Sequence, residues 1–480
     1  MSDSPSSAGL RRNAISLPGA WAMGVAFIAP AAGMAFVPQI VASQAGASVP
    51  FLYLCATLAC LAVAYTIGQF ARGISSAGSF YAFNSRGLGS VVGFFSGWVL
   101  LIGYLTALPQ NMLAFGYSLS VILATHVGVS IPWWIFSGGA TILVTWIAIR
   151  GLGLSVRVDL TLIGLEVIVL SILAATIVFK GGAEGNTAVV FTPSASGHMS
   201  SGLLFGLVFA FLTLVGFESS ATVAEETRDA HRNIPLALLG SVGVTGLFFL
   251  GVTYALTIGF GPHHADQFAN APLPLDTLAQ RYIGSGFAVV VDLAVVVSAF
   301  AVSLAAGNGL VRVLFAMSRD GLLLSRFSIV SPRSHTPAFA ILTVGIVSLV
   351  LEFALGGAFG PYPNAYAYLG ALGGLSVIIL YVIVGISLVA YMRRERRAEF
   401  HPVKHLMVPL GGSAVAALAI YGSYNPFPQG IYLYINFGFL TYAVAGVLVA
   451  IWLRRRHPAM LGVLGHDLDI EAAVVAEEVR

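Results

Sequence analysis

The chain has 480 residues, of which 58% are hydrophobic and only 9% charged, and its mean hydropathy is +0.89. Soluble globular proteins carry roughly 25% charged residues, so this composition excludes an ordinary soluble protein. No polar interval is long enough to hold a separate soluble core. The net charge of +3 follows from membrane topology, and we expect no nucleic-acid partner.

Long apolar runs predict an all-α membrane protein. In hydrocarbon each backbone polar group must be satisfied within its own segment, so such runs have to be helices. One crossing takes about 20 apolar residues, and windows of that length predict about twelve helices. In chain order the predicted helices cover residues 20–44, 50–71, 90–124, 132–149, 158–179, 202–224, 236–260, 285–314, 337–356, 365–391, 405–424 and 430–453.

Charge placement predicts the orientation of these helices, because Lys and Arg accumulate in cytoplasmic loops. Only Lys180 and Arg281 fall in loops that follow odd-numbered helices, which leaves 21 of the 23 Lys and Arg residues on the side of both termini. We therefore expect a multi-pass protein of the cell membrane with cytoplasmic tails at 1–19 and 454–480. The first 19 residues lack an apolar core, so we expect no cleaved signal peptide.

Two of the predicted helices are interrupted. The first contains Pro30, which removes an amide donor, and Gly33, which loosens the backbone; a plain proline kink is the alternative interpretation. The sixth contains Gly216 followed by Glu218, and a carboxylate in an apolar span needs a partner or a function. Interrupted segments at matching positions of two halves are typical of inverted-repeat transporters, with substrate between the broken ends.

We therefore expect a core of ten helices over residues 20–391, built from inverted repeats at about 20–180 and 202–391. This is a five-plus-five arrangement like that of the leucine transporter. Two further helices over 405–453 complete the expected architecture.

Three stretches of the chain resemble one family. They are FLTLVGFESS at 211–220 with EETR at 225–228, SAGSFY at 76–81 with GFFSGW at 93–98, and Arg312 with MSRDGL at 317–322. In this order and spacing they resemble the amino acid–polyamine–organocation permeases over about residues 15–455. One departure is Gln69, where many members of the family carry a glutamate.

The resemblance implies a substrate site at the two interruptions. Exposed amides at the start of a half-helix form an anion site, and those of Ala32, Gly33 and Met34 would hold a substrate carboxylate. The carbonyls of Ala29 and Val215 would hold its ammonium group. A packing role for the alanines is the alternative. The complete predicted set of substrate-binding residues is Ala29, Ala32, Gly33, Met34, Val215, Gly216, Phe217 and Glu218.

Carboxylates within the apolar spans are candidates for coupling transport to an ion gradient. Several family members place a lysine near the position of Glu166, where its cation stands in for sodium, and here the sign of the charge is reversed. Burial favours the neutral form of a carboxyl group, so Glu166 is a candidate proton carrier, with sodium binding or a structural role as alternatives. Glu218 is the second candidate, or a plug at the interruption. Asp292 and Glu352 are expected near the outer face, and Asp159 at a helix mouth is set aside.

Other kinds of site have little support in the sequence. The 10 histidines are scattered and His263-His264 has no cysteine partners, so we expect no metal site. A glycine-rich loop ending in GK[ST] is absent, which excludes an ATP-driven mechanism. No nucleophile–base pair stands out in the sequence, so we expect neither an enzyme nor a bound cofactor. The expectation is a secondary transporter of amino acids. A polyamine or ethanolamine-like amine permease is the nearest alternative, and an ion channel or receptor is the alternative outside transport.

Overall fold

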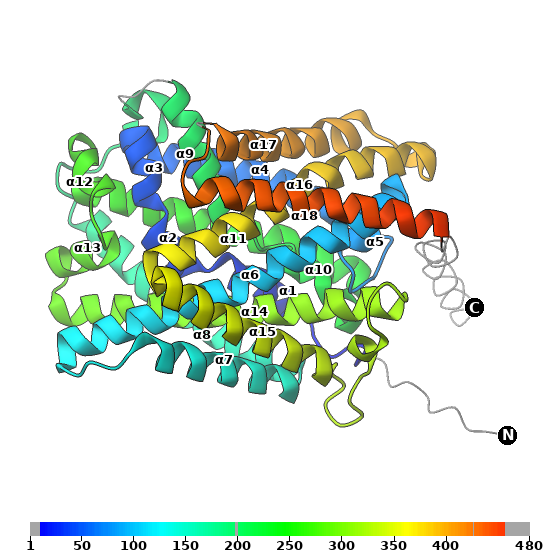
Figure 1. Ribbon diagram of the computed structural model, residues 1–480. Coiled ribbons are helices and arrows are strands. Elements are labelled where there is room, and N and C mark those ends of the chain that lie inside the picture. The colour runs from blue at the N-terminus through cyan, green and yellow to red at the C-terminus, as the bar shows by residue number, and fades with distance from the viewer. Residues whose placement is uncertain (1–9, 197–199, 426, 457–480) are drawn as a thin grey trace.

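The computed structural model describes residues 10–196, 200–425 and 427–456 (Figure 1). These residues form a bundle of α-helices, and among them one isolated β-bridge joins Ile15 and Thr227. The outer parts of the two predicted tails, 1–9 and 457–480, lie outside the described residues. Within the described residues the first helix starts at Leu17 and the last one ends at Arg456.

Eleven segments of the described chain are long and apolar enough to span a membrane. The first consists of α1 (Leu17–Ile28) and α2 (Pro30–Phe36), and the second of α3 (Pro38–Ala45) and α4 (Val49–Ala71). The other nine contain α6 (Ser90–Ile122), α7 (Trp133–Arg150), α8 (Leu152–Phe179), α11 (Ala230–Phe260), α14 (Ser285–Arg319), α15 (Ala338–Phe359), α16 (Tyr366–Arg394), α17 (Val408–Tyr424) and α18 (Ile431–Arg456).

The predicted helix over 202–224 differs from the others. The structure divides it into α9 (Ser200–Thr213) and the single turn α10 (Ser219–Thr222), and its apolar part is shorter than a full span. Shorter helices lie between the long ones: α5 (Phe80–Leu88), α12 (Ala265–Ala269) and α13 (Pro274–Tyr282).

Proline and glycine set many of the helix boundaries. Proline stands in the first turn of α2, α3, α4, α13 and α17, where its missing N–H would have had no partner in the helix. Gly89 and Gly151 precede α6 and α8 with φ of 92° and 125°, which side-chain-bearing residues rarely adopt.

The interrupted first helix lies at the centre of the bundle. In its apolar window 78% of the residues are buried, against 28% in the windows of α17, at the upper edge of Figure 1, and of α18, which crosses the front of the bundle. α1 packs against α8, α11 and α14, and α14 packs against α6. Residues 10–16 and the end of α18 lie on the same side of the bundle, toward the right in Figure 1. We call this side the terminal face and the opposite side the far face.

Candidate functional site

The first interruption falls at Ala29. α1 ends at Ile28, Ala29 has a left-handed backbone conformation with φ 59° and ψ 72°, and α2 starts at Pro30. Pro30 is the physical cause, because proline lacks an N–H and disfavours the helical conformation in the residue before it. Gly33 lies inside α2 and donates its N–H to the Ala29 carbonyl at 2.8 Å.

The first amides of α2 are bonded to side chains of two other helices. Ala31 donates its N–H to Glu166 Oε2 of α8 at 2.9 Å, and Ala32 donates its N–H to Ser298 Oγ of α14 at 3.2 Å. Amides at a helix start have no partner within the helix, and the helix dipole favours a carboxylate there. Glu166 therefore accepts the amide of Ala31, one residue before the amides of Ala32, Gly33 and Met34 that the sequence predicts to hold a substrate carboxylate.

Glu166 is fully buried, and its other oxygen, Oε1, has no hydrogen-bond partner in the described part of the chain. A charge without complete pairing is costly in an apolar interior. A carboxyl group in this setting is suited to bind and release a proton or to hold a cation.

The second interruption separates α9 from α10. Residues 214–218 form turns, and Gly216 has φ of 122°, a conformation that favours glycine. A Cβ atom added at Gly216 would lie 2.9 Å from both the carbonyl carbon and the carbonyl oxygen of Phe27. The two interruptions are therefore in direct backbone contact.

Glu218 is hydrogen-bonded on both oxygens at this second interruption. Oε2 accepts the N–H of Gly216 at 3.0 Å and the hydroxyl of Tyr381 at 2.5 Å, and Oε1 accepts the hydroxyl of Tyr104 at 3.3 Å. The side chain is fully buried. Glu218 thus pairs with the Gly216 amide in the turn between α9 and α10 and ties this turn to Tyr104 of α6 and Tyr381 of α16.

The predicted substrate residues surround this contact. A Cβ atom added at Gly33 would lie 2.9 Å from Thr213 Cγ2, so α2 also reaches the end of α9. The side chains of Met34 and Phe217 are fully buried, whereas Val215 is half-buried.

Aromatic rings close the space around the two interruptions. Phe27 contacts Tyr104 with ring centroids 4.8 Å apart, and Phe217 contacts Tyr381 at 5.4 Å. Rings of this kind can pack against an ammonium group as well as against one another.

Ser298 and Tyr381 are site residues that the sequence did not single out. A serine on α14 and a tyrosine on α16 are ordinary residues in membrane helices, and only the fold brings them to the interruptions. The sequence places Asp159 at a helix mouth, yet in the structure it is fully buried in α8.

The expectation that Glu352 reaches the outer interface is wrong. Glu352 is fully buried and accepts hydrogen bonds from Ser137 and Thr141 of α7 at 2.7 Å and from Ser348 at 2.8 Å. Ser137 and Thr141 are one turn apart, so both point to the same side of α7. These hydroxyls offset the cost of burying the carboxyl group. Asp292 is half-buried in α14.

Charged residues from the family-like stretches connect α14 to the segment after α10 at the terminal face. Arg312 and Glu226 form an ion pair of 2.6 Å in which both side chains are 2% exposed. Arg312 also donates to the backbone and side-chain oxygens of Asn308 at 2.8 and 3.2 Å. Arg319 pairs with Glu225 at 3.0 Å in a more exposed setting.

Glu226→Gln is expected to lower the free energy of unfolding by about 3–5 kcal/mol, because it leaves the buried Arg312 without a compensating charge. Thermal unfolding of the purified protein in detergent measures the loss. The control is Arg319→Gln, which removes an exposed ion pair and should cost about 0–1 kcal/mol. Equal losses in the two variants would contradict a special role for the buried pair.

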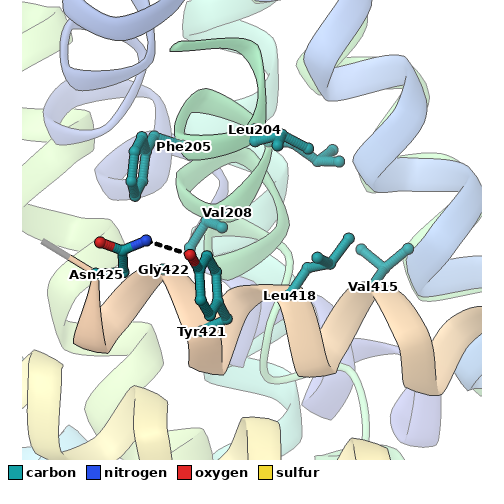
Figure 2. A pocket seen from close by; sticks show the side chains of 9 residues that line it. Leu204, Phe205, Val208, Val415, Leu418, Tyr421, Gly422 and Asn425 are labelled. Atoms are coloured by element: carbon teal, nitrogen blue, oxygen red, sulfur yellow. Dashed lines mark hydrogen bonds between the residues drawn. The ribbon is translucent and has the colours of Figure 1, made fainter. Parts of the chain in front are cut away.

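An apolar cavity of about 190 Å³ lies between α9 and α17. Figure 2 shows Phe205 and Val208 of α9 on one side and Leu418 and Tyr421 of α17 on the other, with Asn425 donating to the Tyr421 hydroxyl. The lining contains none of the predicted substrate residues, so this cavity is separate from the interruptions.

No group of three or more His, Cys, Asp or Glu residues within the described ranges is placed to hold a metal ion. Glu184 contacts His263 and His264 at 2.7 and 2.6 Å at the far face. The hydrogen bond from His263 is the largest cause that lowers the pKa of Glu184, and this carboxylate is exposed.

The interruptions, their buried carboxylates and the helical bundle agree with the result of comparing the sequence with known proteins. Residues 22–455 match the amino acid permease family, and the chain belongs to this family of the amino acid–polyamine–organocation superfamily. The family is one of membrane transporters, and the chain is accordingly a multi-pass transport protein.

Three similar proteins illustrate the range of the family. The low-affinity putrescine importer PlaP of Escherichia coli is 26% identical over 385 residues, covering 78% of this chain and 80% of PlaP. The branched-chain amino acid permease BcaP of Bacillus subtilis is 26% identical over 74% of this chain and 76% of its own length. The methylthioribose transporter of the same species is 26% identical over 87% and 88%.

Proposed function

We propose that this protein is a secondary permease that imports or exchanges amino acids or related amines, coupled to protons through Glu166. The observation that carries the proposal is the bond from the Ala31 amide to Glu166 at the first interruption. It joins a titratable group directly to the backbone at the expected substrate site. Alternating access about the two interruptions, between a cytoplasmic terminal face and an outer far face, completes the proposal.

The ammonium end of the substrate would lie between the two interruptions. Glu218 provides carboxyl oxygens there, and Phe27 and Tyr104 provide aromatic faces. The carbonyls of Ala29 and Val215 add backbone acceptors. This surrounding favours a substrate that carries a positive charge and disfavours a second acidic group.

The carboxylate end gives a physical reason for proton coupling. While Glu166 is ionised, it competes with a substrate carboxylate for the start of α2. Protonation weakens its hold on the Ala31 amide and thereby favours binding of a substrate carboxylate, and by linkage the substrate favours protonation to the same extent. Sodium binding at Glu166 is the alternative form of coupling.

A simple amine permease is the second candidate, and one observation favours it. The amides of Ala31 and Ala32 are already bonded to Glu166 and Ser298. A substrate without a carboxylate would leave these bonds intact. The similarity to a putrescine importer agrees with this candidate.

Competition for a transported label separates the two candidates. Purified protein in liposomes would be tested with alanine, lysine, glutamate, putrescine and ethanolamine. We expect alanine or lysine to compete strongly and glutamate at least about tenfold more weakly, because no cation near the interruptions compensates a second carboxylate. Strong competition by putrescine or ethanolamine, with none from any amino acid, would support the amine permease instead.

Substrate-driven counterflow in the same liposomes tests transport itself. A permease exchanges labelled for unlabelled substrate without an ion gradient, whereas a channel or a receptor does not. Protein-free liposomes are the control, and a lack of counterflow with every substrate of the panel would contradict the proposed function.

A further inference from the structure

Three polar residues follow one face of α8 from its start to the first interruption: Ser155, Asp159 and Glu166. Their spacings of four and seven residues correspond to about one and two helical turns, so all three project from the same side. All three are 0% exposed. Between Ser155 and Glu166, this face connects the terminal end of the helix with the start of α2.

Several atoms of these side chains are left without hydrogen bonds. Both carboxyl oxygens of Asp159, the hydroxyl of Ser155 and Oε1 of Glu166 have no partner among the residues that the structure describes. Buried polar groups are usually hydrogen-bonded, and each exception calls for an explanation. Glu352 and Glu218 show the usual case, since hydroxyl or amide donors satisfy both of their oxygens.

Packing alone does not explain an aspartate at this position. α8 packs there against α1 and α14, and α1 has no charged residue. An apolar side chain would fill the same space without the cost of burying a carboxyl group, which amounts to about 2.5–3.5 kcal/mol on insertion scales for an ionised aspartate.

The neighbouring helices supply no counter-charge to Asp159. In the terminal half of the bundle, the charged and titratable residues on the helices packed against α8 are Arg150, His231, Arg232, Arg312 and Arg319. Arg312 pairs with Glu226 and Arg319 with Glu225, and the other three are exposed. Asp276, Arg281 and Asp292 lie toward the far face. On α8 itself Arg157 is exposed, and Glu166 lies about two turns away.

We propose that Asp159 is a second proton-carrying residue, which exchanges the transported proton between Glu166 and the terminal face. The proposal rests on the proposed coupling through Glu166. A proton leaves the carboxyl group of Glu166 and binds the carboxylate of Asp159, so that one O–H bond breaks as another forms. Ser155, one turn closer to the terminal face, can both accept and donate a hydrogen bond and so passes the proton onward.

The distance between the carboxyl groups determines how the proton crosses. Seven residues of an α-helix rise about 10 Å, which is more than one hydrogen bond. The transfer therefore proceeds through bridging water between polar groups, for which the unpaired oxygens of Asp159 and Glu166 are suitable partners. Asp159 has no part in holding the substrate, because it lies about two turns from the interruption.

The test uses the purified full-length protein in liposomes with a pH-sensitive dye inside. Four proteins are compared: wild type, Asp159→Asn, Glu166→Gln and Glu352→Gln. The last is the matched control, because it makes the same acid-to-amide change at an equally buried carboxyl group away from α8. Counterflow at equal pH, accumulation driven by a pH gradient and substrate-linked proton entry are measured for each.

For Asp159→Asn we expect counterflow within about twofold of wild type, with gradient-driven accumulation and proton entry reduced at least about tenfold, which corresponds to about 1.4 kcal/mol. Asp159→Glu should restore part of the accumulation and part of the proton entry. Glu352→Gln should behave as wild type. Wild-type accumulation and proton entry in Asp159→Asn would overturn the proposal and leave Glu166 coupling intact. If wild type itself moves no protons with substrate, the proposed coupling fails and the relay fails with it.

A labelling experiment on wild type keeps the proposal testable if Asp159→Asn does not fold. Dicyclohexylcarbodiimide adds to a protonated buried carboxyl group, the acid O–H adding across a C=N bond, and peptide mass spectrometry locates the adduct. We expect modification of Asp159 that follows the pH on the terminal side more closely than the pH on the far side. Modification that ignores the terminal-side pH would overturn the proposal.

Discussion

Glu166→Gln is expected to abolish accumulation of substrate against its gradient while exchange of substrate for substrate survives. Glutamine retains an oxygen that can accept the Ala31 N–H, so the cap at the start of α2 persists. It cannot be ionised, and the competition between protein and substrate carboxylates for α2 is lost. The ratio of internal to external substrate concentration at steady state should fall from at least about ten to about one. A tenfold ratio corresponds to a free-energy difference of about 1.4 kcal/mol.

Counterflow in the same liposome preparation is the control for folding and insertion. A variant that still concentrates substrate, with unchanged dependence on pH and sodium, would show that Glu166 is only structural. Glu218 would then become the leading candidate, although its oxygens are bonded to Gly216, Tyr104 and Tyr381.

Gly216→Ala is expected to eliminate transport almost completely. The added Cβ atom would lie 2.9 Å from the backbone of Phe27, which cannot move aside as a flexible side chain could. The φ of 122° adds strain of about 1–3 kcal/mol for any residue with a side chain. We expect uptake per inserted protein below about one tenth of wild type, measured after size-exclusion chromatography of the detergent-solubilised variant.

Gly243→Ala in α11 is the matched control, because nothing lies within 4 Å of its added Cβ atom. A second pair of variants tests the contact between α2 and α9. Gly33→Ala would place Cβ 2.9 Å from Thr213 Cγ2, and Thr213→Ser removes that methyl group while it keeps the hydroxyl. Transport lost in Gly33→Ala and recovered in the double variant would show that close approach of α2 to α9 is needed. Normal transport in Gly216→Ala would remove the interruptions from the site.

Much of the helical architecture could be predicted from the sequence, because a membrane imposes long apolar runs that are visible without a structure. The sequence also marks both interruptions. Pro30 identifies the first, but the break falls at Ala29, since the proline acts on the residue before it. The predicted helix over 202–224 includes the second, and there the structure has a span divided into two short pieces.

The partners of the buried carboxyl groups could not be predicted in the same way. Whether Glu352 reaches water or the hydroxyls of Ser137 and Thr141 depends on which side of α7 it meets, and helix periodicity does not contain this information. Ser298 reaches the start of α2 only because α14 packs beside α1. Asp159 lies near a helix end in the sequence, yet its burial depends on how the neighbouring helices cover that turn. These are properties of tertiary packing rather than of local sequence.

The bridge between Ile15 and Thr227 joins the start of the chain to the segment that follows α10. Ile15 donates its N–H to the Glu226 carbonyl at 3.0 Å and accepts the Arg228 N–H at 2.9 Å. Each bond contributes about 0.5–1.5 kcal/mol, and Ser219 Oγ adds a bond to the Met23 carbonyl at 2.8 Å. These bonds connect residues 10–16, α1 and the segment from α10 to Arg228. We therefore expect a tilt of α1 to carry the second interruption with it.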